Sequence, residues 1–286
     1  MTPRITGILL MVTAMVAFTM LDATAKQLVK TLPPAVAVFG RYFVATVLSL
    51  GVMLRSGGFG LLGTRHPALQ ILRGLLLTGS TILNFIAIMY LQLAQTAAIF
   101  FTIPLWVCAL SVPLLGEHVG WRRWVAVAIG FGGVLVIMRP GTSDFHWAML
   151  LSMGSAFCGS IYNIVTRKVG ARDRAETSLF YVSSIGMLAA AAPLPWLWQM
   201  PQGAQWLMLA FMGLAGSAGH FMLIQAHRLA PASALAPFMY TQIIWMILVG
   251  YLLFGDVPEL WTIIGAGIVV ASGLFVFASE ARHSSS

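Results

Sequence analysis

The sequence predicts an all-α polytopic membrane protein with ten transmembrane helices, arranged as two inverted five-helix repeats. Three observations support this prediction: long uncharged apolar runs, two similar halves, and an uneven distribution of Lys and Arg. Of the 286 residues, 59% are hydrophobic and only 8% are charged, whereas soluble domains carry about 25% charged residues. A water-soluble fold of this length could not bury so much apolar surface, so the lipid bilayer is the expected solvent.

The uncharged runs divide into ten segments. A spanning helix needs about 20 mostly apolar residues, so the runs 74–116 and 177–227 each hold two spans. Their breaks are expected near "LQLAQT" and "PLPWLWQMPQGAQ". The six other spans are expected at 5–21, 34–54, 124–138, 145–166, 229–255 and 260–279. The first run is interpreted as a span rather than a signal peptide, because no soluble domain follows it. Continuous apolar runs also exclude the alternating pattern of a membrane β-barrel.

The positions of Lys and Arg predict the orientation, because cytoplasmic loops carry an excess of them. With the N-terminus in the cytoplasm, the external loops hold only Lys26, Lys30 and Arg139. The cytoplasmic loops then hold Arg4, Arg55, Arg65, Arg122, Arg123, Arg167, Lys168, Arg172, Arg174, Arg228 and Arg282. This arrangement predicts a multi-pass protein of the bacterial inner membrane with both termini cytoplasmic. It also explains the net charge of +8 without nucleic acid as a partner.

Two stretches of the chain are similar to each other. "LQLAQTAAIFFTIPLWVCALSVPLLGE" at 91–117 and "HRLAPASALAPFMYTQIIWMILVGYLLFGD" at 227–256 both run from Leu-Ala through small residues and an apolar segment to Gly and an acid. The loop after the first continues "HVGWRRW", whereas the loop after the second continues "VPELW", without a basic residue. With five spans in each of two halves, 1–140 and 141–286, the second half must lie upside down. Inverted repeats are typical of secondary transporters, with the substrate site near the midplane between the halves.

These features together resemble the EamA-type branch of the drug/metabolite transporter superfamily. The resemblance rests on two five-helix halves, the small-residue runs "LAQTAAIFFTIP" and "LAPASALAPFMY", the Leu-Gly-Glu and Phe-Gly-Asp at 115–117 and 254–256, the Gly-rich last helices, and "FGRY" at 39–42. It implies cytoplasmic termini, a central cavity between the halves, and a small metabolite or drug as substrate. The second half departs from the first at Pro104, where Tyr240 or Ile243 stands instead. Substrate specificity could depend on that difference.

Charged residues inside spans are costly and indicate function by default. Asp22 and Arg41 are each expected roughly 10–12 Å below the same membrane surface, at ~1.5 Å per residue. An ion pair between them could hold the first two helices together, or could act as a gate or coupling site. Burial and a neighbouring arginine act oppositely on the protonation of a carboxyl group, so the sequence leaves the protonation of Asp22 open. Lys26 could bind an anionic substrate group or extend to the interface.

Asn84 and His220 occupy equivalent positions of the two halves, each far from the ends of its span. Polar groups at this depth need partners in other helices or a wet cavity. Asn163 is the repeat equivalent of Asp22. Tyr240, Gln242 and Trp245 in one helix, and Thr102, Pro104 and Trp106 in its counterpart, suggest an aromatic and amide lining for an uncharged or zwitterionic metabolite.

The function predicted from these residues is secondary transport, by alternating access, of a small metabolite such as an amino acid. The alternative is a multidrug exporter for lipophilic cations. An intramembrane enzyme is not expected, because the sequence contains neither HExxH nor GxSxG. The candidate substrate-binding residues are Asp22, Arg41, Asn84, Trp106, Asn163, His220, Tyr240, Gln242 and Trp245. Candidate gating or coupling residues are Asp22, Lys26 and Arg41.

The expected partners are the lipid bilayer, a small-molecule substrate, and protons or a counter-substrate, in a monomer or homodimer. No cofactor is expected, because no nucleotide-binding loop GxxxxGK[ST] is present. A metal site is not expected either, because His220 and His227 are seven residues apart and have no third ligand nearby.

Overall fold

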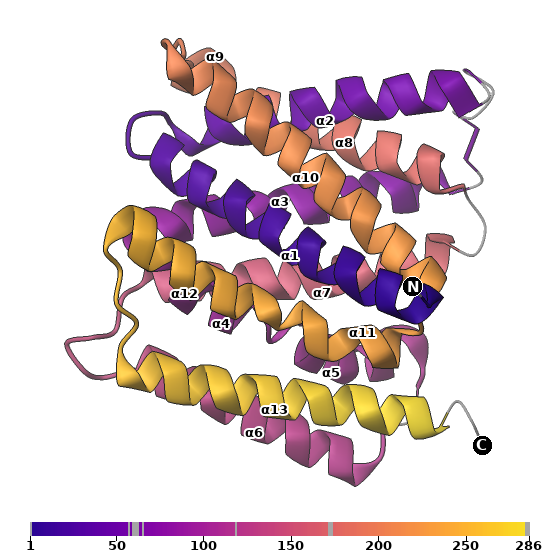
Figure 1. The fold of residues 1–286 in the computed structure, drawn as a ribbon, viewed down its shortest axis with the longest axis vertical. Coiled ribbons are helices and arrows are strands. Elements are labelled where there is room, and N and C mark those ends of the chain that lie inside the picture. Colours follow the sequence, from indigo (N-terminus) through magenta and orange to yellow (C-terminus); the bar gives the residue numbers. More distant parts are fainter. Residues whose placement is uncertain are drawn as a thin grey trace.

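The computed structural model is a bundle of helices that run nearly parallel or antiparallel to one another (Figure 1). It describes residues 2–56, 58, 63–64, 66–117, 119–170 and 174–283. In that part of the chain the helices are α1 Pro3–Leu28, α2 Pro34–Ser56, α3 Pro67–Tyr90, α4 Leu93–Phe100, α5 Ile103–Leu115, α6 Trp121–Met138, α7 Ala148–Gly170, α8 Ala175–Ala191, α9 Leu194–Leu197, α10 Ala204–Leu229, α11 Ala232–Met239, α12 Thr241–Phe254 and α13 Leu260–His283. Arg65 and Arg172 of the predicted basic loops, and the side chain of Arg282, lie outside the described residues.

Nine segments of the described chain are long and apolar enough to cross a membrane. Two of them are pairs of shorter helices: α4 with α5, and α11 with α12. The expected tenth span, α8, has 17 residues, and it packs against α2 and α3 within the bundle. The predicted all-α membrane fold, with nine to ten crossing helices, is therefore confirmed.

The breaks in the two discontinuous spans lie at equivalent places. α4 ends before Phe101 and Thr102, and the next helix begins at Ile103 with Pro104 in its first turn, where the missing N–H leaves no intrahelical bond unmade. The break between α11 and α12 lies at Tyr240 without a proline in the equivalent place. Instead, the hydroxyl of Thr241 donates to the Phe238 carbonyl at 2.6 Å, as that of Thr102 donates to Ile99 at 2.7 Å. In both halves a threonine hydroxyl at the break therefore bonds to a carbonyl three residues earlier.

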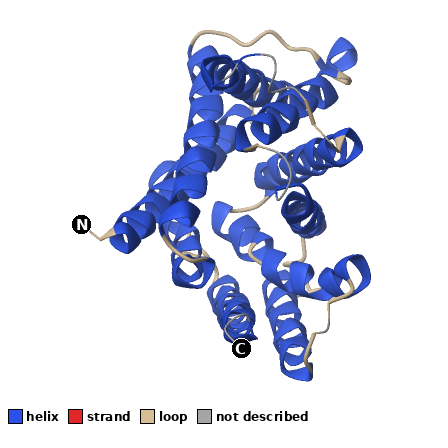
Figure 2. Ribbon diagram, turned by 90° about the vertical axis from the view of Figure 1, so that its right-hand side faces the viewer, coloured by secondary structure: helices blue, strands red, loops and turns tan. Residues whose placement is uncertain are grey.

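The helix packing has the pairwise order expected of two related halves. α1 packs on α10, as its counterpart α7 packs on α3, while α2 pairs with α8 and α6 pairs with α13. Both termini lie at one end of the bundle, which faces the viewer in Figure 2. We call this end the terminal face, marked by the start of α1 and the end of α13. The other end, at which α1 and α12 finish, is the opposite face.

Glycines at the α6–α13 contact have two different roles. A Cβ on Gly265 would lie 2.6 Å from the Gly133 carbonyl oxygen, and a Cβ on Gly133 would lie 2.9 Å from the Ile268 side chain. Gly132 and Gly267 have no atom within 4 Å of such a Cβ. The close packing of α6 on α13 therefore depends on one glycine face of each helix, and not on every glycine.

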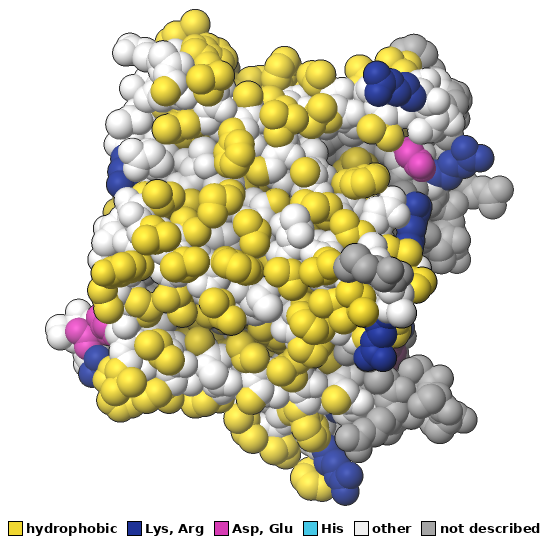
Figure 3. All heavy atoms as spheres, in the orientation of Figure 1, with side chains coloured by type: hydrophobic (Ala, Val, Ile, Leu, Met, Phe, Trp, Pro, Cys, Tyr) yellow, Lys and Arg dark blue, Asp and Glu magenta, His cyan; other side chains and the backbone are white. Residues whose placement is uncertain are grey.

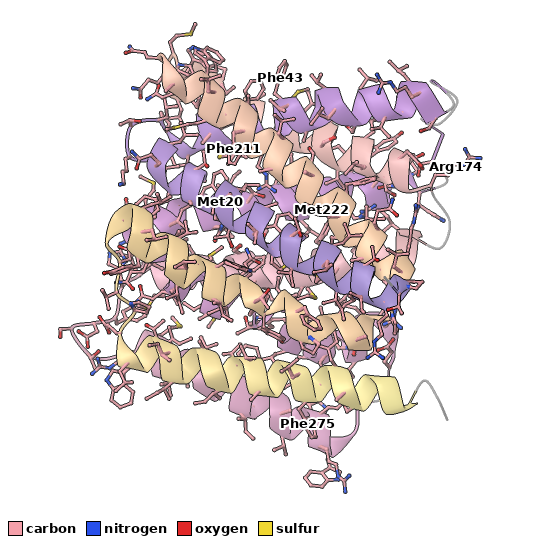
Figure 4. All side chains as sticks on the ribbon, in the orientation of Figure 1. Met20, Phe43, Arg174, Phe211, Met222 and Phe275 are labelled. Atoms are coloured by element: carbon pink, nitrogen blue, oxygen red, sulfur yellow. The ribbon has the colours of Figure 1, made fainter. Side chains whose placement is uncertain are left out.

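Apolar side chains cover the side of the bundle that Figure 3 shows, and the charged side chains visible there lie mainly at its two ends. Phe43, Phe211 and Phe275 are among the aromatic residues exposed on α2, α10 and α13 (Figure 4). Five tryptophans near helix ends are exposed at the opposite face, as is typical of residues at a membrane interface; they are Trp147, Trp196, Trp198, Trp206 and Trp261. This outer surface is suited to lipid, so polar groups that face inward need a separate explanation.

Candidate functional site: a polar cavity between the halves

A cavity of about 170 Å³ lies between the two halves. Its wall is built from α1, α2, α3, α4, α7, α10 and α12, so both repeats contribute to it. The lining residues are Phe18, Leu21, Asp22, Arg41, Leu77, Ser80, Thr81, Asn84, Thr96, Ala97, Phe100, Phe101, Ser155, His220, Gln242 and Met246. A charged and polar lining inside an apolar bundle is the arrangement expected of a solute-binding site in a membrane.

Asp22 lies in the last two turns of α1 and faces Asn84 of α3. The Asn84 side-chain amide donates a hydrogen bond of 3.1 Å to Oδ1 of Asp22. This bond satisfies one carboxylate oxygen and joins two helices of the first half. Both residues also line the cavity.

Arg41 of α2 is held by a different set of contacts. Its Nη1 donates to the Thr81 hydroxyl at 3.1 Å, and that hydroxyl also contacts the Tyr42 hydroxyl at 3.1 Å. The guanidinium lies over the rings of Tyr42 and Phe85, 5.3 and 5.9 Å from their centroids. These contacts fix the direction of the guanidinium while other N–H groups stay free to bind.

The considered ion pair between Asp22 and Arg41 is not a direct contact in the structure. Both side chains line the same cavity, but among the described residues no nitrogen of Arg41 lies within 4.0 Å of an Asp22 oxygen. The physical reason is that each side chain is oriented by another group, Asn84 for the acid and Thr81 for the base. The cavity wall therefore contains an acid and a base that are not in direct contact with each other.

His220 and Gln242 bring polar groups from the second half. The His220 ring meets the edge of Phe18, with centroids 5.0 Å apart. Gln242 is 8% exposed and lies one turn before Met246 on α12. Neither side chain has a hydrogen-bond partner within the described chain, yet both line the cavity. The repeat-related positions Asn84 and His220 thus meet at one site from opposite halves.

Four of the candidate residues lie outside the cavity wall. The Trp106 indole packs edge-on against Phe131 and Phe157. Asn163 is exposed and donates to the carbonyl of Gly159, one turn back on α7. The Tyr240 ring packs against Phe101, behind the wall, at a centroid distance of 5.0 Å. Trp245 packs in the apolar cluster that α1 and α10 form. Their helix faces turn away from the cavity, so we do not assign them to the site.

Lys26 also lies away from the cavity, at the opposite face. Its Nζ is 2.6 Å from Oδ2 of Asp256 and 3.1 Å from the Leu91 carbonyl oxygen. The lysine side chain is 12% exposed. The sequence suggested that Lys26 binds an anionic substrate group or extends to the interface. The observed contact is of neither kind: it joins the first half to the second.

Several lining residues were not singled out from the sequence. Phe18 is four residues before Asp22, Ser80 is four before Asn84, and Met246 is four after Gln242. Residues four apart share a helix face, so this spacing could have identified them. Ser80 and Ser155 also exchange hydrogen bonds with each other's carbonyls at 2.9 and 2.8 Å. That link between α3 and α7 has no comparable signal in the sequence.

Comparison with known proteins gives a consistent result. The model of the EamA-like transporter family matches residues 5–139 and 146–278. A riboflavin transporter of Vibrio cholerae is 31% identical, over 97% of this chain and 95% of its own length. An S-adenosylmethionine uptake transporter of Rickettsia felis is 28% identical over 97% and 94%. A pseudopaline exporter of Pseudomonas aeruginosa is 25% identical over 93% and 94%. A solved structure, titled only as the crystal structure of a protein, matches with a TM-score of 0.66 at 19% identity, covering 98% of this chain and 99% of that one. This last similarity concerns the fold alone.

Proposed function

The chain belongs to the EamA-like transporter family, and on that premise we propose that it carries a zwitterionic, amino-acid-like metabolite by alternating access through the central cavity. One observation carries this proposal. Asp22 and Arg41 bring opposite charges to one cavity without direct contact between them. A zwitterion offers the complementary pair of charges, so one small ligand could satisfy both residues.

The chemistry of the two charged residues fits the two ends of such a ligand. An arginine guanidinium presents N–H groups in a fork that matches a carboxylate. Asp22 accepts hydrogen bonds and would bind an ammonium or another cationic group. Phe18, Phe100 and Phe101 add aromatic surface to the same wall. Aromatic rings can contact either the apolar part of a ligand or a cation over the ring face.

The relatives support a small metabolite as the substrate class but differ in its chemistry. S-adenosylmethionine is an amino acid that also carries a sulfonium cation, whereas riboflavin has no such charges. Because Asp22 and Arg41 line this cavity, an amino-acid-like ligand with charges of both signs suits this chain better than an uncharged one. Lipophilic cations, the substrates of the alternative multidrug function, could contact Asp22 but would bring no anionic group to Arg41, which lines the same cavity, and a second cation beside Arg41 has an electrostatic cost.

The proposal also includes the orientation of the protein in the membrane and the energy source for transport. We place the chain in a bacterial inner membrane, with the terminal face in the cytoplasm, because most of the basic side chains follow the positive-inside bias there. Exchange against a counter-substrate, or symport or antiport with protons, would provide the driving force. We propose a monomer or homodimer as the functional unit.

A thermal-shift series on the detergent-purified protein tests the substrate class. Binding to the folded state stabilises it by RT ln(1 + [L]/Kd), about 2.7 kcal/mol at a ligand concentration of 100 Kd. We expect S-adenosylmethionine or methionine to raise the melting temperature. Methionine methyl ester, whose carboxyl group is esterified and uncharged, and 3-(methylthio)propylamine, which has no carboxyl group, should have little effect. Riboflavin and tetraphenylphosphonium complete the series.

Variants of Arg41 show whether a shift arises in the cavity. Arg41→Gln should abolish the response to the zwitterion, whereas Arg41→Lys, which keeps the charge but not the fork, should weaken it. Shifts with tetraphenylphosphonium and none with the zwitterions would overturn the proposal in favour of cation export. A response to riboflavin alone would overturn it in favour of an uncharged substrate.

A further inference from the structure

The repeated Gly-acid motif has the same local structure in both halves. α5 ends at Gly116 and α12 ends at Gly255, and both glycines have a φ of 69°. The following amide groups turn back onto the helix: Glu117 N–H donates to the Ser111 carbonyl at 3.3 Å and Asp256 N–H to the Gly250 carbonyl at 3.1 Å. The glycine amides themselves donate to the carbonyls four residues back, Gly116 to Val112 and Gly255 to Tyr251, both at 3.0 Å. This is the αL type of helix end, which requires the left-handed conformation that glycine adopts readily. The motif therefore fixes an acid just beyond the helix end in each half.

Each of these acids pairs with a base on the first helix of the other half. Asp256 Oδ2 lies 2.6 Å from Nζ of Lys26, in the last turn of α1. Glu117 Oε1 lies 3.1 Å from Nη1 of Arg167, in the last turn of α7. Since α7 is the repeat counterpart of α1, the two ion pairs are equivalent under the inverted repeat. We call them the Lys26–Asp256 clasp and the Glu117–Arg167 clasp.

The inverted arrangement places the two clasps at opposite ends of the bundle. The Lys26–Asp256 clasp lies at the opposite face, where α1 and α12 finish, and the Glu117–Arg167 clasp lies at the terminal face, where α5 and α7 finish. In the fold, α1 packs on α12 and, correspondingly, α7 packs on α5. Each clasp thus joins the two halves at one end of the bundle.

The two clasps differ in how firmly they are built. The side chains of Lys26 and Asp256 are 12% and 22% exposed, whereas those of Arg167 and Glu117 are 69% and 40% exposed. Lys26 additionally lies over the Phe254 ring, 4.9 Å from its centroid. Because water screens an exposed pair far more than a buried one, the Lys26–Asp256 clasp is the stronger of the two.

A second cross-half contact reinforces the stronger clasp. Gln92 Nε2, at the break between α3 and α4, donates to the Val257 carbonyl at 3.1 Å. Leu91, whose carbonyl accepts from Lys26, lies in the same break. The loop after α12 is therefore held at two neighbouring points of the first half. If the two halves separate at the opposite face, the Lys26–Asp256 ion pair and the Gln92–Val257 hydrogen bond must both break.

We propose that the two clasps are the alternating gates of this protein: the Lys26–Asp256 clasp closes the cavity toward the opposite face, and the Glu117–Arg167 clasp closes it toward the terminal face. The inference rests on the alternating access of the proposed function, but it is independent of which substrate binds. Removing one clasp removes an interaction made only in the state closed at that face. The population then shifts toward the state that is open there.

The test measures access to the cavity directly and needs no substrate. A reporter Phe100→Cys, on the cavity wall, is placed in a Cys108→Ala, Cys158→Ala background. Its reaction rate with a membrane-impermeant sulfonated maleimide is measured in right-side-out and in inverted membrane vesicles. Single cysteines at Thr31 and Arg4, which are exposed at the opposite and the terminal face, show which face each preparation presents.

We expect Asp256→Asn to raise the labelling rate from the opposite face about three- to tenfold, without raising it from the terminal face. Glu117→Gln should do the reverse with a smaller change, because its clasp is exposed. The swap Lys26→Asp with Asp256→Lys should restore the parental rate. Lys30→Met is the matched control, because Lys30 also lies over Phe254, at 4.7 Å, but belongs to neither clasp.

Two results would overturn the proposal. One is an Asp256→Asn rate that stays at the parental value from both faces, or rises equally from both. The other is a well-folded charge swap that labels as fast as Asp256→Asn. If the ion pair closes the opposite face, the swapped pair should close it again and restore the parental rate. Face-specific labelling together with a silent thermal-shift series would contradict the proposed substrate class and leave the clasps supported.

Discussion

Asn84 of α3 donates a hydrogen bond of 3.1 Å to the carboxylate of Asp22 in α1. The bond connects two helices of the first half at the wall of the cavity, and it leaves the negative charge facing the space that Arg41 also lines. It explains how an acid can be held inside the bundle without a direct ion pair. It also makes the fold tolerant of a neutral amide at this position.

Asp22→Asn should therefore fold but bind poorly. The new amide can still accept from Asn84 through its oxygen, while the charge that would bind a cationic group is lost. Hydrogen bonds to charged groups contribute about 1.5–3 kcal/mol, so Kd for a zwitterionic ligand should rise about ten- to a hundredfold in a binding titration. The matched control is Asp144→Asn, which removes the carboxylate that pairs with Arg139 outside the cavity. A normal Kd in Asp22→Asn would remove this acid from the site.

His220→Ala should change ligand affinity while the yield of folded protein holds. The ring lines the cavity and has no hydrogen-bond partner within the described chain, so its nitrogens are available to a ligand. Loss of one such bond corresponds to roughly a two- to tenfold change in Kd. His227→Ala serves as the control, because that exposed histidine of the same helix contacts the Leu223 carbonyl. Loss of yield with an unchanged Kd in the remaining protein would instead assign His220 to packing.

Gly265→Ala should destabilise the contact between α6 and α13. Its Cβ would lie 2.4 Å from the Ile137 side chain and 2.6 Å from the Gly133 carbonyl oxygen, and overpacking of this kind costs about 1–3 kcal/mol. Gly267→Ala, two residues further along, meets nothing within 4 Å and should be neutral or slightly stabilising, since alanine favours a helix. Melting temperatures of the two purified variants provide the comparison. Equal melting temperatures would contradict the assigned glycine faces.

Tyr240→Phe should leave stability unchanged or improve it, whereas Tyr42→Phe should reduce it. The Tyr240 hydroxyl is buried and has no hydrogen-bond partner among the described residues, and removing an unsatisfied polar group relieves a desolvation cost. The Tyr42 hydroxyl contacts Thr81 at 3.1 Å, so its loss should cost about 1 kcal/mol. Tyr42→Phe should also weaken the hold on Arg41. Thermal unfolding of the pair measures both effects, and a larger loss in Tyr240→Phe would contradict this assignment.

The sequence predicted the spans and the repeat well, because both depend on signals that are local along the chain. Apolar runs without charge determine which segments enter the bilayer, and the Gly-acid motif marks the same helix end in both halves. The tenth span was the weakest case: α8 has only 17 residues, and the short α9 occupies part of the expected break. Helix propensity and hydropathy do not determine where a span stops when both flanking stretches are apolar.

The site was predictable where polar residues stand out from apolar surroundings. Asp22, Arg41, Asn84, His220 and Gln242 all line one cavity. Trp106 and Trp245 do not line this cavity. Aromatic residues suit the apolar core as well as a cavity wall, and the sequence does not determine which way a helix is rotated. Lys26 and Asp256 are 230 positions apart, and their pairing depends on the contact between α1 and α12. No periodicity within either segment encodes that contact.

Counterflow in proteoliposomes tests the central claim most directly. Vesicles containing the purified protein are loaded with unlabelled S-adenosylmethionine or methionine and diluted into a trace of the labelled compound. The account predicts transient accumulation of the label in the parental protein and none in Arg41→Gln or protein-free vesicles. Accumulation of labelled tetraphenylphosphonium in its own counterflow experiment, with no accumulation of either zwitterion, would contradict it.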